Sequence, residues 1–111
     1  MSHRIAKVNE LLQQQLSLLI FEEFERDLGI LTVTAVDTTH DLKNAKVYIS
    51  TINEPDLLDV LDKLQNRAFK FQQQLAKRLT MKYIPKLEFI MDRSKDKIHQ
   101  VEKLLNQIQS K

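Results

Sequence analysis

The residues best suited to bind a ligand lie in one stretch, where basic residues recur without any acid. Residues 63–86 contain seven Lys or Arg and no Asp or Glu. A row of cations of this kind attracts polyanions such as the phosphate backbone of nucleic acid. Three aromatic residues lie in or near this stretch (Phe69, Phe71 and Tyr83), and exposed rings can stack on unpaired bases. Phe71 falls on an apolar helix line, so we expect it to pack in the core.

The charge of the chain is distributed unevenly. Residues 1–62 hold five basic and eleven acidic residues, although the formal net charge of the 111 residues is only +2. Basic side chains on a helix often do no more than keep its outer face in water. The absence of acids between residues 63 and 86 favours nucleic-acid binding over this alternative. The acids before Gly29 are interpreted as a solvated helix face: Glu22, Glu23, Glu25 and Asp27.

Residues that could carry out catalysis or hold a metal are scarce. The chain has no Cys, which excludes a thiol nucleophile and a thiolate metal site. One glycine cannot supply a phosphate-binding loop or a dinucleotide fingerprint. No carboxylate or second histidine stands at ligand spacing from His3, His40 or His99. We therefore predict a protein that is not an enzyme and has no metal, no cofactor and no small-molecule substrate.

The length and composition are those of one globular domain with room for a short tail. No apolar run approaches the roughly 20 residues needed to span a bilayer, and the first residues lack the apolar segment of a secretory signal. We expect a cytoplasmic protein that is not bound to a membrane. We divide it into a domain over residues 1–92 and a helical tail over residues 93–111.

The first element is predicted to be a helix that Ser2 caps and that ends near Leu28-Gly29. Gly29, the only glycine, is placed as the positive-φ residue of the C-terminal cap. The apolar residues recur at helical spacing and form a wide stripe: Ile5, Val8, Leu11, Leu12, Leu16, Leu18, Leu19 and Phe21.

Two strands are predicted next, over residues 30–38 and 45–52, because β-branched residues dominate both. The polar segment between them is short, so the strands should pair antiparallel. Alternation along the second strand should bury Ala45, Val47 and Ile49 and turn Lys46, Tyr48 and Ser50 outward. The same alternation over Leu87, Phe89 and Met91 predicts a third strand.

A long helical span should fill residues 56–81, with Pro55 in its first turn and Ile84-Pro85 beyond its end. One apolar line runs along it through Leu57, Leu61, Leu64, Ala68, Phe71, Leu75 and Leu79. Placing residues 100° apart gathers the cations Lys63, Arg67, Lys70, Lys77 and Arg78 on a neighbouring face. A last helix, which Ser94 can cap, should carry the apolar seam Ile98, Val101, Leu105 and Ile108.

In this order of elements the chain resembles the ribosome-binding factor A family of bacterial small-subunit assembly factors. The resemblance runs nearly from end to end. It is carried by Arg4-Ile5-Ala6, Asp27-Leu28-Gly29, Leu31-Thr32-Val33-Thr34, Asp41-Leu42, Ala45-Lys46-Val47-Tyr48-Ile49-Ser50, Asn66-Arg67-Ala68, Arg78-Leu79, Pro85 with Leu87 and Phe89, Asp92 with Ser94, and Val101 with Leu104-Leu105.

The resemblance implies an α+β fold of the type II KH-like class, α-β-β-α(kink)α-β with a C-terminal helix, whose helices lie on one face of a three-stranded sheet. The family kinks its helix pair at an Ala-X-Gly signature, which aligns here with Ala68-Phe69-Lys70. Because lysine replaces the glycine, we expect a gentle bend near these residues and not a break.

The resemblance also implies a role: binding the immature 30S subunit through 16S ribosomal RNA and assisting maturation near the RNA's 5′ end, especially in the cold. We expect a monomer. The residues predicted to contact RNA are Arg4, Lys7, Lys63, Arg67, Ala68, Lys70, Lys77, Arg78, Lys82 and Lys86. The alternative is a protein–protein interaction module that uses the last helix, although a seam of about two heptads is short for a coiled coil.

Overall fold

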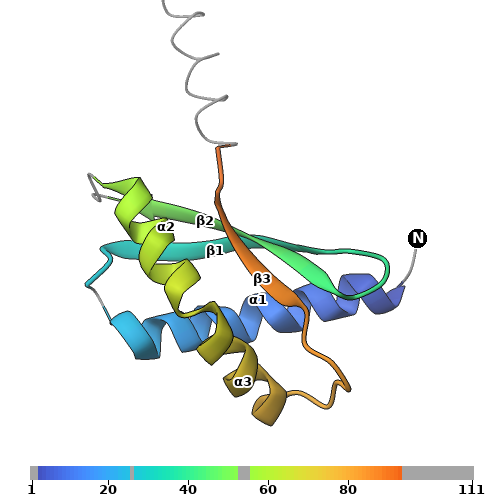
Figure 1. Ribbon diagram of the computed structural model, residues 1–111. Helices are drawn as coiled ribbons and strands as arrows, with labels where there is room; N and C mark the ends of the chain where they lie inside the picture. The colour runs from blue at the N-terminus through green and yellow to red at the C-terminus, as the bar shows by residue number, and fades with distance from the viewer. Residues whose placement is uncertain (1–2, 26, 53–55, 94–111) are drawn as a thin grey trace, which may run out of the picture.

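The computed structural model describes residues 3–25, 27–52 and 56–93. These residues form three helices and three strands in the order α1 (His3–Phe24), β1 (Ile30–Thr38), β2 (Asn44–Ile52), α2 (Leu57–Asn66), α3 (Ala68–Arg78) and β3 (Lys86–Met91). Figure 1 shows α1 lying along the sheet and the α2–α3 pair crossing it. The predicted α+β arrangement is confirmed. The tail over residues 94–111, with its predicted cap and seam, lies outside the described residues, as does Pro55.

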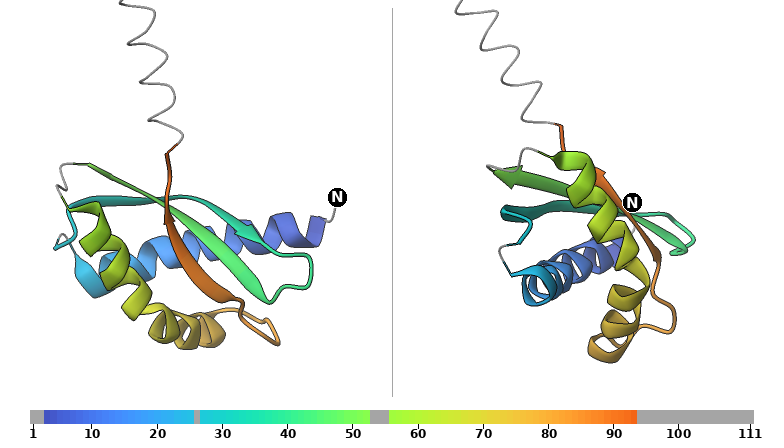
Figure 2. Two further views of the ribbon diagram at one scale, coloured as in Figure 1. Left: turned by 45° about the horizontal axis from the view of Figure 1, so that its top comes forward. Right: turned by 60° about the vertical axis from the view of Figure 1, so that its left-hand side comes forward.

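The sheet has the order β1-β2-β3, with β2 in the centre. β1 and β2 pair antiparallel, as the short connection predicts, whereas β2 and β3 run parallel because the helices make the crossover between them. Ala45, Val47 and Ile49 are buried, so the predicted face of β2 is correct. The two further views in Figure 2 agree that the helices gather on one side of the sheet.

β1 contains a β-bulge that the pattern of its sequence does not predict. The register shifts between Val33 and Ala35, so one extra residue stands on this strand. Val33 and Val36 are therefore both buried although they are three positions apart, which strict alternation would forbid. The bulge keeps both valines on the helix-covered face of the sheet.

Helix α1 ends earlier than the sequence predicts. Glu25 has a φ of 50° and its N–H donates to Phe21 O at 2.7 Å, so the chain leaves the helix directly after Phe24. Gly29 does have positive φ, 76°, but it leads into β1 instead of capping the helix. The predicted stripe was also too wide, because Leu18 and Phe21 are 53% and 61% exposed while Ile20 is buried.

The long helical span is two helices that meet at Arg67, where φ is −102° and ψ is 2°. The predicted interruption of the span is confirmed, but it is a break between two helices at Arg67 and not a gentle bend over Ala68 to Lys70. Asp56 caps α2 by accepting a 3.0 Å bond from the N–H of Asp59. The apolar line persists across the break through Leu64, Ala68, Phe71 and Leu75, which are buried, whereas Leu57 is exposed and Val60 is buried in its place.

Both helices attach to β3 and the residues just before it through glutamine side chains. Gln65 Nε2 donates to Leu87 O at 3.0 Å, and Gln65 Oε1 accepts from Phe89 N at 3.1 Å. Gln72 Nε2 donates to Pro85 O at 3.0 Å. The Gln65 amide satisfies backbone groups that an edge strand would otherwise leave unpaired. The rings of Phe71 and Phe89 meet edge-on, with centroids 6.1 Å apart.

Candidate nucleic-acid interface

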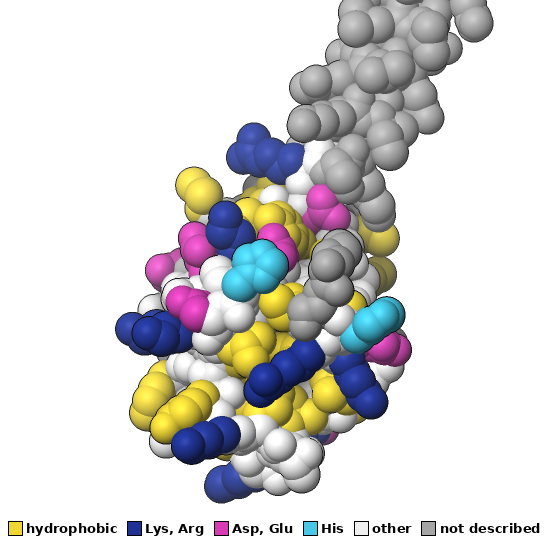
Figure 3. Space-filling model, turned by 90° about the vertical axis from the view of Figure 1, so that its right-hand side faces the viewer, with side chains coloured by type: hydrophobic (Ala, Val, Ile, Leu, Met, Phe, Trp, Pro, Cys, Tyr) yellow, Lys and Arg dark blue, Asp and Glu magenta, His cyan; other side chains and the backbone are white. Residues whose placement is uncertain are grey.

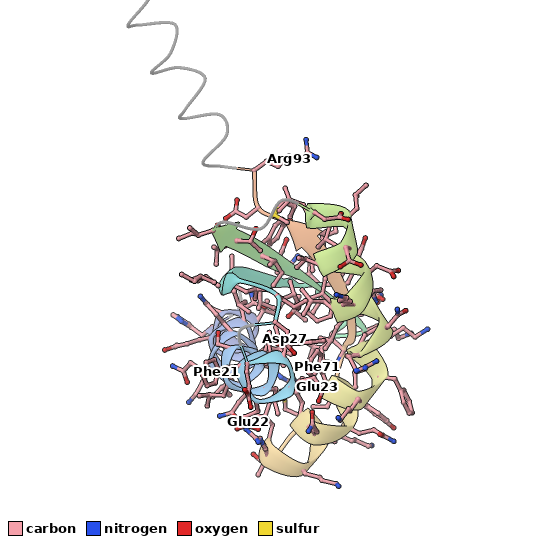
Figure 4. All side chains as sticks on the ribbon, turned by 90° about the vertical axis from the view of Figure 1, so that its left-hand side faces the viewer. Phe21, Glu22, Glu23, Asp27, Phe71 and Arg93 are labelled. Carbon is pink, nitrogen blue, oxygen red and sulfur yellow. The ribbon has the colours of Figure 1, made fainter. Side chains whose placement is uncertain are left out.

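The cations near the break between α2 and α3 are paired with a carboxylate of α1. Arg67 Nε lies 2.9 Å from Glu23 Oε1, and Lys70 Nζ lies 2.6 Å from Glu23 Oε2. Figure 4 shows Glu23 at the end of α1 that faces the α2–α3 pair. One carboxylate thus joins both helices to α1, with only 18% of its side chain exposed.

Two more cations of the predicted basic face are paired in the same way. Arg78 Nη2 lies 3.0 Å from Glu22 Oε2, which again belongs to α1. Lys63 Nζ lies 3.0 Å from Asp59 Oδ2, one turn earlier in α2. The expectation that no acid neutralises this face is therefore wrong. Glu22 and Glu23 come from α1, so a count within residues 63–86 could not find them, whereas Asp59 lies four residues before Lys63 in the same helix.

The acidic residues before Gly29 also have a different role from the one the sequence predicts. Glu22 and Glu23 are ion-pair partners and not merely a solvated face. Hydrogen bonds from Lys70 first, and then from Arg67, hold the pKa of Glu23 below its ordinary value. Glu23 therefore stays ionised under acidic conditions that would protonate an unpaired glutamate.

The remaining predicted contacts on the helices separate into exposed and buried residues. Lys7 on α1 and Lys77 on α3 are exposed, and among the described residues neither forms an ion pair. Ala68 is 9% exposed and belongs to the core, where its small side chain allows close packing at the start of α3. Its surroundings favour a packing role.

The other predicted cations meet at the far end of α3, around a hollow of about 970 Å³. Three elements form it: the start of α1, the connection between β1 and β2, and the segment from α3 to β3. Its basic residues are Arg4, Lys43, Lys82 and Lys86, of which the sequence prediction missed Lys43. Figure 3 looks onto this side of the molecule, where basic side chains surround exposed apolar ones.

The aromatic residues differ in their surroundings. Phe71 is fully buried, which confirms its predicted packing role. Phe69 and Tyr83 are 70% and 73% exposed, so both rings are open to a partner. Tyr83 lies in the wall of the hollow, with Lys82 Nζ 5.5 Å from its ring centroid. Phe69 stands on α3 next to Ala68, away from this hollow.

The described residues offer neither a metal-binding cluster nor a membrane-spanning helix. Across residues 3–25, 27–52 and 56–93, no three His, Cys, Asp or Glu side chains are grouped so that they could hold a metal ion. No helix in this part of the chain has the length and apolar character needed to cross a membrane.

Comparisons with known proteins show which family and which solved structures this chain is similar to. A family model described as ribosome-binding factor A matches residues 4–105. The ribosome-binding factor A of Bdellovibrio bacteriovorus is 37% identical over 108 residues, covering 96% of this chain and 81% of that protein. The crystal structure of ribosome-binding factor A from Thermus thermophilus superimposes with a TM-score of 0.73 at 27% identity, covering 81% of this chain and 98% of the other. A homology model of the Thermus thermophilus factor, fitted into a cryo-EM map of its complex with 30S, gives a TM-score of 0.58 at 30% identity, covering 75% and 93%.

Proposed function

The chain belongs to the ribosome-binding factor A family, and from this premise we propose that it is a ribosome assembly factor that binds the immature 30S subunit. The observation that carries the proposal is the family match over residues 4–105, together with the shared fold of the described residues. The related Thermus thermophilus factor has been fitted into a map of a 30S complex, which supports the same partner here. The protein acts in the cytoplasm as a monomer, by binding and not by catalysis.

The RNA of the subunit, 16S ribosomal RNA, is the component that this surface suits. Its phosphates are anions, and the protein offers exposed cations at both ends of α3 and along α1. Cations that are already paired must leave a carboxylate before they can bind a phosphate. Lys7, Lys77 and the cations around the hollow form no ion pair with a carboxylate of the described residues, so a phosphate that binds them displaces none.

Binding would assist late maturation of the subunit and processing of the 16S RNA near its 5′ end. The test is to deplete the protein in its host at low temperature and to map the 5′ ends of 16S RNA by primer extension. We expect precursor ends to accumulate and free 30S subunits to increase. Re-expression of the wild-type chain should reverse both effects. Mature 5′ ends in depleted cells would contradict the role in processing.

Direct binding is tested separately by co-sedimentation of the purified protein with 30S subunits through sucrose. We expect it to accompany 30S subunits at low salt and to dissociate as salt rises, because each phosphate contact releases counterions when it forms. A protein that stays at the top of the gradient at low salt would contradict the proposed function.

A further inference from the structure

We propose that the hollow between α1, the β1–β2 connection and the α3–β3 segment holds an unpaired RNA nucleotide, whose base stacks on Tyr83 and whose flanking phosphates meet Arg4, Lys43, Lys82 and Lys86. This inference rests on the proposed function for the class of partner. Beyond the proposed function, it names the hollow as the binding surface and unpaired RNA as the form of RNA that the hollow selects.

The charge of the hollow favours an anion. Its lining has the four cations and a single carboxylate, Asp41. Both Thr39 Oγ1, at 2.6 Å, and Lys43 N, at 3.0 Å, donate to Asp41 Oδ1, so this carboxylate is engaged within its own loop. None of the four cations forms an ion pair with a carboxylate of the described residues. Phosphate binding here displaces no carboxylate of the described residues, in contrast to binding at the cations that Glu22 and Glu23 neutralise.

The aromatic wall favours an unpaired base. Tyr83 is 73% exposed and so presents its ring to solvent beside the basic residues. Stacking a base on such a ring removes apolar surface from water and needs no particular sequence, because every base has a π face. Bases in a duplex are already stacked between their neighbours, so only an unpaired one can reach the ring.

The walls of the hollow are held before any ligand arrives. Lys86 N donates to Lys43 O at 2.9 Å, which joins the β1–β2 connection to the start of β3. Gln72 attaches the opposite wall to α3 through Pro85 O, as described above. Leu42 has a φ of 61°, a left-handed conformation that is uncommon for a bulky side chain. Its N–H donates to Thr39 O at 2.9 Å, within the loop that brings Lys43 to the rim.

The experiment uses the intrinsic fluorescence of Tyr83 in the full chain. The protein has no Trp and two Tyr, so Tyr48→Phe leaves Tyr83 as the only emitter. This variant is titrated with a short oligouridylate and, separately, with an RNA duplex of the same length, and free tyrosinamide corrects for light absorbed by RNA. We expect the single strand to quench Tyr83 emission and the duplex to leave it nearly unchanged.

Variants test the two components of the site. Tyr83→Leu should weaken single-strand binding about tenfold, whereas Tyr83→Phe, which keeps the ring, should bind like the wild type. Lys82→Gln should reduce the slope of log affinity against log salt by about 0.7 for a lost single-strand phosphate contact. Lys46→Gln, an exposed lysine on β2 that does not line the hollow, is the matched control and should leave the slope unchanged.

The outcomes separate this inference from the proposed function. Unchanged Tyr83 emission on adding the single strand, or equal quenching by the duplex, overturns the nucleotide site. So does a Lys82→Gln variant whose salt slope equals that of Lys46→Gln. In each of these cases wild-type protein that still co-sediments with 30S subunits leaves the proposed function standing, whereas wild-type protein that fails to co-sediment contradicts the proposed function itself.

Discussion

Glu23 and Lys70 stand 47 positions apart in the sequence, yet Lys70 Nζ lies 2.6 Å from Glu23 Oε2. Through this contact and the parallel one to Arg67, the acidic end of α1 lies against the basic start of α3. In the sequence the acidic and basic segments look like two independent surfaces. In the structure they face each other between α1 and the α2–α3 pair. We expect any RNA phosphate that binds Arg67 or Lys70 to compete with Glu23 for that cation.

Replacing Glu23 by glutamine separates the structural part of this contact from its effect on binding. We expect Glu23→Gln to lower the free energy of unfolding by about 1 kcal/mol, because partly exposed ion pairs contribute little. Affinity for 30S subunits should rise by no more than about fivefold, because the competing ion pairs are weak. Glu10→Gln, an exposed acid of the same helix, should change neither quantity. Urea unfolding measures the free energy of unfolding, and co-sedimentation measures affinity for 30S subunits. Weaker 30S binding by Glu23→Gln would contradict competition between Glu23 and RNA phosphates.

The same residue gives stability a dependence on pH. The pKa of Glu23 is lower in the folded protein than in the unfolded chain, since Lys70 and Arg67 donate to its ionised form. Its contribution is therefore complete above the ordinary glutamate pKa of about 4.3 and is lost as pH falls through the lower folded value. The difference in unfolding free energy between wild type and Glu23→Gln should shrink as pH is lowered from about 6 to about 3. A constant difference over that range would show that the ion pairs do not shift the pKa.

Reversing Arg67 and Lys70 together to glutamate should weaken association with 30S subunits and make its salt dependence shallower, if these cations meet phosphates. The sequence alone predicts that folding is unaffected, as it is for most exposed substitutions. The structure changes this expectation: two new carboxylates would face Glu23, and we expect a loss of about 1–2 kcal/mol.

The triple variant with Glu23→Lys provides the control for that experiment. It restores opposite charges across the contact between α1 and α3, so unfolding free energy should recover while 30S binding stays weak. If binding recovers along with stability, the loss in the double variant came from the fold and not from contacts with RNA. The substitutions Glu22→Gln and Glu23→Gln are not neutral controls, although the sequence suggests it, because both residues pair with predicted RNA contacts.

Val47 tests the assignment of the sheet face. It is fully buried in the central strand, next to Phe89 of β3 in the register. Val47→Asp should unfold the domain, because a charge without a partner would be buried in the core. Val47→Ala should remain folded and lose about 1–2 kcal/mol from the smaller buried side chain. Circular dichroism with thermal unfolding measures both, and a stable Val47→Asp protein would place this residue at the surface.

Gln65 tests the attachment of α2 to the edge of β3. Gln65→Leu leaves Leu87 O and Phe89 N without their side-chain partners, and we expect a loss of about 1–3 kcal/mol. Gln73→Leu, on an exposed position of α3, is the matched substitution and should change stability by less than about 0.5 kcal/mol. Equal stability of the two variants would mean that water replaces the Gln65 amide at the strand edge.

The elements that the sequence predicts well are those fixed by local patterns. The bounds of β1 are those predicted from its β-branched residues, and the alternation along β2 correctly gives Ala45, Val47 and Ile49 as buried. Period and propensity act between neighbouring residues, so they can be read along the chain. The same reasoning does not give the end of α1 or the break at Arg67. Neither point has a glycine or proline that would predict the end of a helix. Glu25, with a φ of 50°, and Arg67, with a φ of −102° and a ψ of 2°, depart from helical dihedral angles without such a local signal.

The charges show most clearly what only the tertiary structure decides. The sequence identifies residues 63–86 as basic, but it cannot show that Glu23 and Glu22 reach Arg67, Lys70 and Arg78 across two helices. Nor can it show that Arg4, Lys43 and Tyr83, which come from three separate segments, share one hollow. Electrostatic and stacking interactions depend on distance in space, and the crossing of α1 with α3 and the pairing of β2 with β3 set those distances.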